Sequence, residues 1–473
     1  MRKVQEKAFQ ENVRHWIETH KDEMLRDLTM LVNIPSVSDS ASGIAPFGQG
    51  CRDAVDAFLE LGKKYGFETR NYEYYVAEIR MGNAEHDIGL WTHLDVVPVG
   101  EGWLYEPFSA VQKGNYLIGR GAQDNKGPAI AMLYVMRCLR DLGIEMKHSI
   151  RLFAGTNEEK GMADMDYYTK RYACPEFSLV PDSGFPVCYG ERGAFDFAVT
   201  TDKPVSDEFP AVYAGEVRTM IPETARADFT GCAGAEAFLR TCTEPPYSVE
   251  GKVLTAHGIS RHAMSPDGAI SPLGLLARVL LSCPSLSETD RSALEFLQDA
   301  CSDFQGTALG LACADEESGP LICAATMLRL EPDRRLTFEA SAKFPVSMRC
   351  AQLEPLVREA CAARGCSVNI LRAGNPNYYN RDHPAVQRLT EVYNRVMGTA
   401  EKPFIMSGGT YARKIPRAVA FGTGMPVEPL PLSVFPKGHG DFHQPDEALD
   451  LTRQLRSMEI YALGLAAIDD LTF

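Results

Sequence analysis

The chain has 473 residues, of which 45% are hydrophobic and 23% charged, and its formal net charge is −15 at pH 7. This composition is typical of a globular protein, and the length exceeds that of one ordinary core, so two or three domains are expected. The negative charge argues against a nucleic-acid partner, because phosphate binding needs a basic face. Such acidity suits a protein that gathers cations among carboxylates, although it is more common as a plain surface property.

Apolar residues at helical spacing predict one or two amphipathic helices over residues 5–32, and a further helix is predicted over residues 51–65. Alternating strands and helices follow at residues 87–92, 127–142, 149–154 and 177–180. Alternation of this kind predicts a mostly parallel sheet with helices on both faces.

After about residue 190 the pattern changes to strands of a half-exposed sheet. The elements predicted there are strands at 194–200, 224–229 and 336–344 and helices at 273–281 and 353–363. The first pattern then returns, with helices over 385–397 and from 449 onward. We therefore predict an α/β protein whose main domain is formed by residues 1–189 and 385–473, with an inserted α+β domain at residues 190–384.

The thirteen cysteines include no C-x-x-C pair, and most lie in apolar segments. This usage indicates reduced, buried thiols rather than a disulfide framework. The first 22 residues are charged throughout and lack the apolar stretch of a signal peptide, and no apolar run is long enough to cross a bilayer. We expect a cytoplasmic protein with no membrane partner.

Five short segments place His, Asp or Glu side chains in loops or just beyond predicted strands, where ligands bind in open α/β sheets. They are His93-Leu94-Asp95, the loop around Asp124, Asn157-Glu158-Glu159, Pro181-Asp182 and His443-Gln444-Pro445-Asp446-Glu447. Taken singly, each is ordinary: a polar pair at a strand end, a helix cap or a surface turn. Together they supply two imidazoles and several carboxylates, which can build a two-metal site.

These segments, in this order, resemble the family of di-zinc peptidases that includes aminoacylase, carboxypeptidase G and succinyl-diaminopimelate desuccinylase. The stretch His93-Leu94-Asp95-Val96-Val97-Pro98 carries the resemblance most clearly, and the match covers nearly the whole chain. The long inserted domain is similar to the dipeptidase V branch, in which one enlarged lid mimics the partner subunit of dimeric relatives. A parallel-sheet catalytic domain with an inserted lid is therefore implied.

The resemblance also implies the ligands of two divalent metal ions. One ion would be held by His93 and Asp182 and the other by Glu159 and His443, with Asp124 bridging the two. Imidazole and carboxylate ligands suit zinc, with manganese and cobalt as alternatives. The bond between Asp124 and Asn125 resembles a cis peptide of the family.

Three further roles follow from the same resemblance. Glu158 would be the general base for a metal-bridging water, and Asp95 would orient His93. In the lid, His262 would reach the scissile carbonyl and stabilise the developing oxyanion.

The substrate-binding residues depart from the family pattern. Lys343 stands where an Arg is expected to grip the substrate carboxylate, and a Lys loses the bidentate fork. Thr219 replaces a lid Asn, and Asn125 replaces the second Asp of the family's D-D-K-G loop. The other residues expected to bind substrate are Gly408, Gly409, Thr410 and Arg413, the last as a compensating cation.

These observations favour a metal-dependent dipeptidase that hydrolyses short peptides and acts as a monomer, because the enlarged lid completes the site within one chain. One alternative is an N-acyl amino acid deacylase or carboxypeptidase of the same family, which the Lys343 and Thr219 replacements keep open. Another is a catalytically silent metal-binding scaffold. Such a scaffold needs neither a base at Glu158 nor an oxyanion donor at His262.

Overall fold

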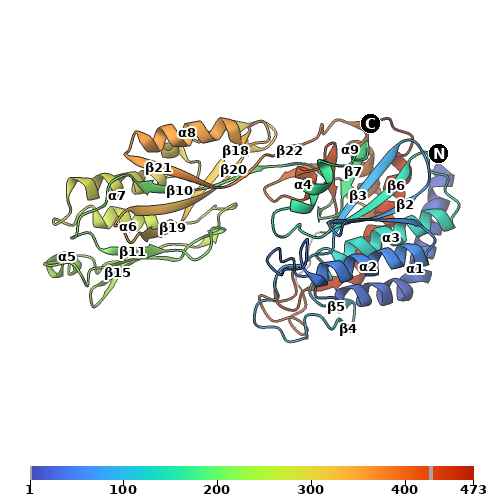
Figure 1. Cartoon of the computed structure of the whole chain (residues 1–473), viewed down its shortest axis with the longest axis horizontal. Helices are drawn as coiled ribbons and strands as arrows, with labels where there is room; N and C mark the ends of the chain where they lie inside the picture. Colours follow the sequence, from blue (N-terminus) through green and yellow to red (C-terminus); the bar gives the residue numbers. More distant parts are fainter. Residues whose placement is uncertain (1–2, 426–429) are drawn as a thin grey trace. The chain divides into compact units, whose positions relative to one another are not determined.

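The computed structural model describes residues 3–425 and 430–473. The chain forms two compact units (Figure 1). Unit 1 contains Met1–Gly190 and Tyr378–Phe473, and unit 2 contains Glu191–Asn377. The predicted domain boundaries at residues 190 and 385 stay a prediction, because compactness alone does not test whether each part folds independently.

The centre of unit 1 is a nine-stranded sheet with the order β1-β2-β6-β3-β7-β24-β9-β22, and β23 pairs with β9. Its strands are β1 (Glu68–Tyr72), β2 (Val76–Met81), β3 (Asp87–His93), β6 (Ser149–Gly155), β7 (Phe177–Val180), β9 (Val187–Glu191), β22 (Asn377–Tyr378), β23 (Phe404–Met406) and β24 (Ala418–Phe421). The inner strands β6, β3, β7 and β24 run parallel, while β1, β2 and β9 add antiparallel pairings. The predicted α/β class with a mostly parallel central sheet is confirmed.

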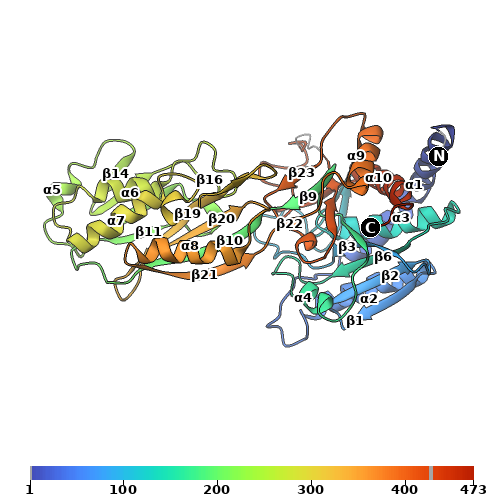
Figure 2. The ribbon, with the colours of Figure 1, turned by 90° about the horizontal axis from the view of Figure 1, so that it is seen from above.

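Helices cover both faces of this sheet, but unevenly. One face packs against α1 (Lys3–Val32), α2 (Gln49–Lys64), α3 (Lys126–Asp141), α9 (Pro384–Met397) and α10 (Leu451–Ile468). The other face packs against the short helix α4 (Ala163–Thr169) and the 3-10 turn η2 (Tyr411–Arg413). Figure 1 shows α1, α2 and α3 as neighbours, and Figure 2 shows α9 beside α10.

Strand β3 shows why both faces need cover. Its side chains alternate between the two cores, with Leu90 on the side of the long helices and Trp91 on the side of α4. Trp91 stacks on Phe153 of β6 with ring centroids 3.9 Å apart and meets Tyr168 of α4 edge-on. A strand buried on both faces reads as a continuous apolar run, as this one does.

A small sheet brings the C-terminal part of unit 1 beside the glycine-rich loop at residues 119–125, which contains Asp124. It consists of β4 (Val111–Lys113), β5 (Tyr116–Ile118) and β26 (Ala448–Asp450). Ala448 pairs with Ile118, and the N–H of Gly119 donates to the carbonyl of Glu447 at 2.9 Å. A two-stranded parallel pair, β8 (Ser183–Gly184) with β25 (Thr423–Gly424), lies just after β7.

Unit 2 is built on an eight-stranded antiparallel sheet with the order β14-β15-β13-β11-β19-β20-β10-β21. Its strands are β10 (Gly193–Thr201), β11 (Ala211–Ala214), β13 (Thr224–Asp228), β14 (Tyr247–Glu250), β15 (Val253–His257), β19 (Ile322–Leu330), β20 (Leu336–Phe344) and β21 (Cys366–Gly374). The remaining elements are β12 (Met220–Ile221), β16 (Arg261–His262), β17 (Ala314–Asp315), β18 (Gly319–Pro320), α5 (Glu236–Leu239), α6 (Pro272–Leu280), α7 (Glu288–Ala300), η1 (Thr307–Leu309) and α8 (Cys350–Ala362).

The sheet of unit 2 has one apolar and one polar face. Phe338 and Ala340 of β20 belong to the core that α6, α7 and α8 cover (Figure 2). The alternate residues of the same strand, including Glu339 and Lys343, point to the opposite face. Among the residues that the structure describes, no helix is long and apolar enough to span a membrane.

Candidate metal centre

Three neighbouring strands deliver the candidate ligands to one edge of the unit 1 sheet. His93 is the last residue of β3, Glu158 and Glu159 follow β6, and Asp182 follows β7. Because β6, β3 and β7 are adjacent and parallel, their carboxyl ends lie at the same edge. The sheet therefore brings together side chains that are far apart in the sequence, such as His93 and Asp182, which are separated by 89 positions.

Asp124 and His443 reach this edge from loops. Asp124 ends the glycine-rich loop before α3, and the peptide bond that follows it is cis, as the resemblance predicts. His443 lies in the C-terminal segment before β26, with a backbone φ of 62°. A non-glycine residue in this region of φ is uncommon, and the neighbouring contacts of the segment must hold it there.

The donor atoms of these residues lie at the spacing of a shared metal shell. Asp124 Oδ1 is 2.9 Å from His93 Nε2, and Asp124 Oδ2 is 3.1 Å from His443 Nε2. His443 Nε2 is also 3.0 Å from Glu159 Oε1, and His93 Nε2 is 3.9 Å from Asp182 Oδ2. Ligands about 2.0–2.1 Å from a tetrahedral ion are separated by about 3.3 Å, so these distances fit donor atoms around a small divalent cation.

The donor atoms form two sets, and within each set all atoms lie within 4.8 Å of one another. One set comes from His93, Asp124 and Glu159, and the other from His93, Glu158 and Asp182. Glu158 thus comes close to the same cluster as the five predicted ligands. All four carboxylate residues are half-buried, whereas His93 is buried.

The charge balance of the cluster favours added cations. Burial lowers the pKa of His93, but its contacts with Asp124 and Asp95 outweigh this and raise the pKa well above the usual value. Hydrogen bonds with Asp124 and Glu159 raise the pKa of His443 to about 10. Positive charge is therefore stabilised at both Nε2 atoms, the positions from which metal ions would be held. The residues present fit a pair of divalent ions.

Asp95 holds two parts of the cluster in place. Its backbone carbonyl lies 2.9 Å from His93 Nδ1, which leaves Nε2 directed at the cluster. Its buried carboxylate lies 3.5 Å from the same nitrogen and accepts hydrogen bonds from the N–H groups of Glu158 and Glu159, each at 3.1 Å. A partner of this kind fixes the orientation of a histidine ligand.

Glu447 fixes the backbone of the loop that carries Asp124. Its Oε1 accepts hydrogen bonds from the N–H groups of Gly121, Gln123 and Asp124 at 3.0–3.1 Å. Its Oε2 accepts from Arg120 Nη1 at 2.7 Å, and both side chains are 1% exposed. Burial raises the pKa of Glu447, and Arg120 acts in the opposite direction.

Asp164 ties the loop after β6 to Tyr411, which directly follows the glycine loop at residues 407–410. Its Oδ2 accepts from the N–H groups of Thr156 and Asn157 at 2.7 and 2.8 Å and from the hydroxyl of Tyr411. A Cβ at Gly155 would lie 2.0 Å from that hydroxyl, so only glycine fits between these groups. Burial raises the pKa of Asp164 to about 6.

The sequence interpretation missed the supporting roles of Glu447, Arg120 and Asp164. Glu447 lies in the same short segment as the predicted ligand His443, and this position could have indicated that it supports the site. Asp164 has no motif around it, and its contacts depend on the packing of α4 beside η2.

The predicted substrate residues of unit 1 lie in the glycine loop at residues 407–410 and, for Arg413, in the 3-10 turn η2 that follows it. Thr410 is buried, and its side chain accepts from the N–H of Ala412. The guanidinium of Arg413 donates to the carbonyl of Gly408 and packs on Gly409, where a Cβ would lie 2.2 Å from Cζ. These contacts shape the loop, and substrate binding by its residues stays a prediction.

The predicted residues of unit 2 include a local pair. Met220 pairs with His262 in the short β12–β16 ladder, and the N–H of Ala263 donates to the carbonyl of Thr219 at 2.8 Å. The N–H of Met264 donates to His262 Nδ1 at 3.2 Å. A neutral His262 therefore carries its proton on Nε2, which can donate a hydrogen bond.

Lys343 lies elsewhere in unit 2, on the polar face of β20. It is paired in register with Ala194 of β10 and Ile322 of β19, and its residue exposure is 8%.

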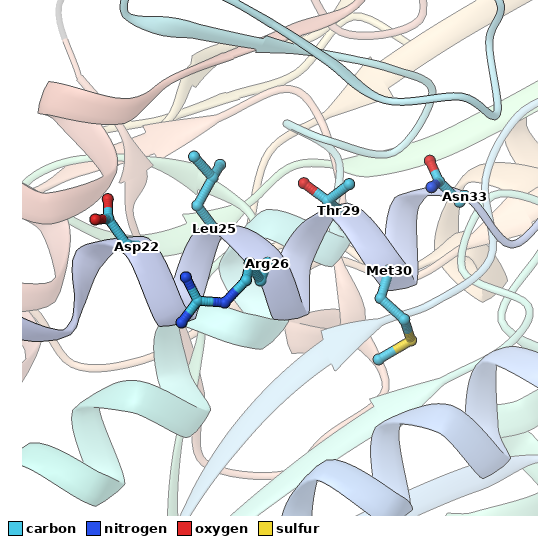
Figure 3. A pocket seen from close by; sticks show the side chains of 6 residues that line it. All are labelled: Asp22, Leu25, Arg26, Thr29, Met30 and Asn33. Atoms are coloured by element: carbon cyan, nitrogen blue, oxygen red, sulfur yellow. The ribbon is translucent and has the colours of Figure 1, made fainter.

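A separate hollow of about 670 Å³ runs along α1 (Figure 3). It is lined by Asp22, Leu25, Arg26, Thr29, Met30 and Asn33. None of these side chains belongs to the donor cluster, and the hollow has no part in the candidate metal centre.

Comparison with known proteins assigns a family to the chain. The profile of Peptidase family M20/M25/M40 matches residues 89–466. The YtjP protein of Bacillus subtilis (strain 168), provisionally assigned as a dipeptidase, is 30% identical over 462 residues, covering 94% of this chain and 97% of YtjP. The Beta-Ala-Xaa dipeptidase of Lactobacillus delbrueckii subsp. lactis is 28% identical over 472 residues, covering 95% and 97%.

Solved structures show the same fold. Human carnosine dipeptidase 1 matches with a TM-score of 0.60 at 16% identity, over 98% of this chain and 99% of that chain. Aminoacylhistidine dipeptidase from Vibrio alginolyticus matches with a TM-score of 0.58 at 15% identity, over 94% and 96%.

Replacing Glu447 should destabilise the protein strongly. In Glu447→Ala the buried Arg120 loses its partner, and we expect the free energy of unfolding to fall by about 3–5 kcal/mol. Urea unfolding in EDTA measures this without a contribution from bound metal. Glu354→Ala, which breaks an exposed pair with Arg358, is the control and should cost less than about 1 kcal/mol. Equal losses in the two variants would contradict the anchoring role of Glu447.

Asp164 should make the stability depend on pH. Its pKa is about 6 in the folded protein against the ordinary value of 3.8, so the folded state holds the proton more tightly than the unfolded state. Stability is then lost as the pH rises through this range. Relative to Asp164→Asn, the wild type should lose up to about 3 kcal/mol of unfolding free energy between about pH 4 and pH 7.

Urea unfolding in EDTA at several pH values tests this expectation. Asp207→Asn, at a side chain that is 95% exposed, controls for the loss of a surface carboxylate. A difference between wild type and Asp164→Asn that stays constant over this pH range would refute it.

Proposed function

The chain belongs to peptidase family M20/M25/M40, and on this premise we propose that it is a metal-dependent dipeptidase that hydrolyses short peptides. The observation that carries the proposal is the placement of Asp124, whose two carboxylate oxygens face two different imidazoles with Glu158 close by. The dipeptidase names of YtjP and of the Lactobacillus relative support the substrate class.

In this proposal His93 and Asp182 hold one ion, Glu159 and His443 hold the other, and Asp124 bridges them. The donor set of imidazoles and carboxylates supports zinc, with manganese and cobalt as alternatives. When bound, the ions lower the pKa of water and polarise the scissile carbonyl.

Glu158 is the proposed general base. It accepts the proton of the attacking water and passes it to the amine that leaves when the peptide bond breaks. Burial and the neighbouring Asp182 raise the pKa of Glu158 well above its usual value, which suits a carboxylate that must bind and release a proton. The backbone N–H of Glu158 donates to the carboxylate of Asp95, so the backbone from which this side chain extends is fixed.

His262 is the proposed donor to the developing oxyanion, and its Nε2–H is the atom that would donate. The residues proposed to bind the substrate are Lys343, Thr219, the loop residues Gly408, Gly409 and Thr410, and Arg413 of η2. A Lys in place of the family's Arg supplies charge without a fork, which predicts a weaker grip on a carboxylate.

We further propose that the chain acts as a monomer in the cytoplasm. All thirteen cysteines lie in the part of the chain that the structure describes, none forms a disulfide there, and most are buried, which suits a reducing compartment. His262 and Lys343 are present in the same chain as the ligand set, so one chain carries all the proposed residues. Light scattering of the purified protein tests the monomer, which a dimer mass would contradict.

Purified protein with added zinc or manganese should hydrolyse unmodified dipeptides. Glu158→Gln removes the base and should lower kcat about 10²–10⁴-fold while leaving metal binding intact. Glu60→Gln, at an exposed side chain, is the matched control and should retain full activity. Arg413→Ala and Lys343→Ala should raise KM for dipeptides if these residues bind the carboxylate.

The same panel contains tripeptides and N-acetyl amino acids. Activity confined to acyl amino acids would assign the chain to the deacylases, and cleavage of longer peptides would indicate a carboxypeptidase. Metal binding without hydrolysis of any substrate would leave the silent scaffold.

His262→Ala should lower kcat about 10²–10³-fold, because one oxyanion donor is lost. KM should change little if the donor acts mainly in the transition state. His257→Ala is the control, since His257 is an exposed histidine of the same unit that contacts Ser248. Equal activity of both variants would rule out the oxyanion role.

A further inference from the structure

Asn125 occupies the N-cap of α3 but does not cap it. Asparagine is a favoured N-cap residue, because its side-chain oxygen accepts from the first free N–H groups of a helix, an interaction worth about 1 kcal/mol. The Asn125 side chain makes no such bond, and the residue is 1% exposed. Its amide group is therefore directed elsewhere, at the cost of the cap.

The side chain instead connects the ends of two adjacent parallel strands. Its Nδ2 donates to Asp182 Oδ1 at 3.0 Å and to the carbonyl of Pro181 at 2.9 Å, both just after β7. Its Oδ1 accepts from the N–H of His93, the last residue of β3, at 3.4 Å. One amide thus contacts the two residues proposed to share an ion, and it directly follows the bridging Asp124.

These contacts give the two oxygens of the Asp182 carboxylate different surroundings. Oδ1 accepts from Asn125, while Oδ2 is the oxygen 3.9 Å from His93 Nε2. A carboxylate whose one oxygen is held by an N–H donor presents the other oxygen to a metal ion.

An aspartate at position 125 would change this arrangement. An ionised carboxylate has no N–H to donate, so it cannot hold Asp182 Oδ1. It would also add another negative charge to a cluster that already contains Asp124, Glu158, Glu159 and Asp182.

We propose that Asn125 is a positioning residue that holds Asp182 as a one-oxygen ligand of the ion shared with His93, and so sets the affinity of that one metal position. The inference rests on the proposed function only in taking His93 and Asp182 as ligands. It gives a role to one of the three positions at which the chain departs from the family pattern.

Zinc titration of the full-length apoprotein against a chromophoric chelator tests the proposal without using activity. The variants are Asn125→Ala, which removes the hydrogen bonds, and Asn125→Asp, which restores the family residue. Asn71→Asp is the charge control, because Asn71 is an exposed residue of β1 and its oxygen can still accept from the N–H of Tyr74. Thermal unfolding of each variant in EDTA separates a loss of metal affinity from a loss of fold.

The wild type should bind two ions, and both Asn125 variants should weaken one of the two binding steps by about 10- to 100-fold. The other step should remain as in the wild type, and each variant should still unfold in one cooperative transition in EDTA, at a melting temperature lowered by the lost buried hydrogen bonds. Asn71→Asp should bind both ions like the wild type.

Three results would overturn the inference. Unchanged binding in Asn125→Ala would show that the hydrogen bonds do not position Asp182, whatever Asn125→Asp does. Tighter binding in Asn125→Asp would show that added charge outweighs positioning. A wild type that binds no metal would overturn the proposed function and this inference with it, whereas the first two results leave the proposed function intact.

Discussion

The shared Asp124 carboxylate is the constraint on which the rest of the site depends. Its two oxygens face imidazoles from distant parts of the chain, at the end of β3 and in the C-terminal segment. A carboxylate can serve both sides only if its backbone is fixed, and Glu447 fixes it by accepting hydrogen bonds from three backbone N–H groups of the same loop. Since His443 and Glu447 lie four residues apart, one segment supplies a proposed ligand and also holds the loop opposite.

Three buried carboxylates around the cluster fix loop backbones in the same way. Asp95, Asp164 and Glu447 are buried carboxylates that accept backbone N–H groups of the loops carrying the proposed ligands. A carboxylate suits this task because it accepts several hydrogen bonds and has no donor to oppose an N–H group, whereas an amide presents both. The consequence is an excess of negative charge behind the ligands, which makes bound cations favourable.

Few buried cations offset this charge. Arg120 pairs with Glu447, and the ammonium of Lys126 donates to the carbonyl of Ile34 at 2.7 Å. Burial lowers the pKa of Lys126 to about 7, so its charge costs more to maintain than that of a surface lysine. The cationic side chains beside the site therefore neutralise only part of its negative charge.

The sequence predicted the features that are coded locally. Strand β3 and helix α3 follow from continuous apolar runs, and the residues just beyond the inner strands converge because parallel strands share an edge. Strand β1 (Glu68–Tyr72) was not predicted because it is polar and mostly exposed. Helix α7 was missed although Ser287 and Asp290 form a capping box, a signal that is readable from sequence. Asp164 could not be recognised, since only tertiary packing places it against the loop after β6.

Two of the departures from the family pattern affect different kinds of contact. The exchange at Thr219 lies beside contacts made by the backbone, whereas the exchange at Asn125 changes contacts made by the side chain. His262 is positioned by main-chain bonds: Met220 pairs with it across β12 and β16, and the carbonyl of Thr219 holds the next residue. A Thr in place of Asn leaves these bonds in place, because they do not use the side chain of residue 219. The exchange at Thr219 therefore changes the side chain that we propose to contact the substrate and leaves these main-chain bonds unaltered. Asn125 is the opposite case, since its contacts with Asp182 use the side-chain amide itself.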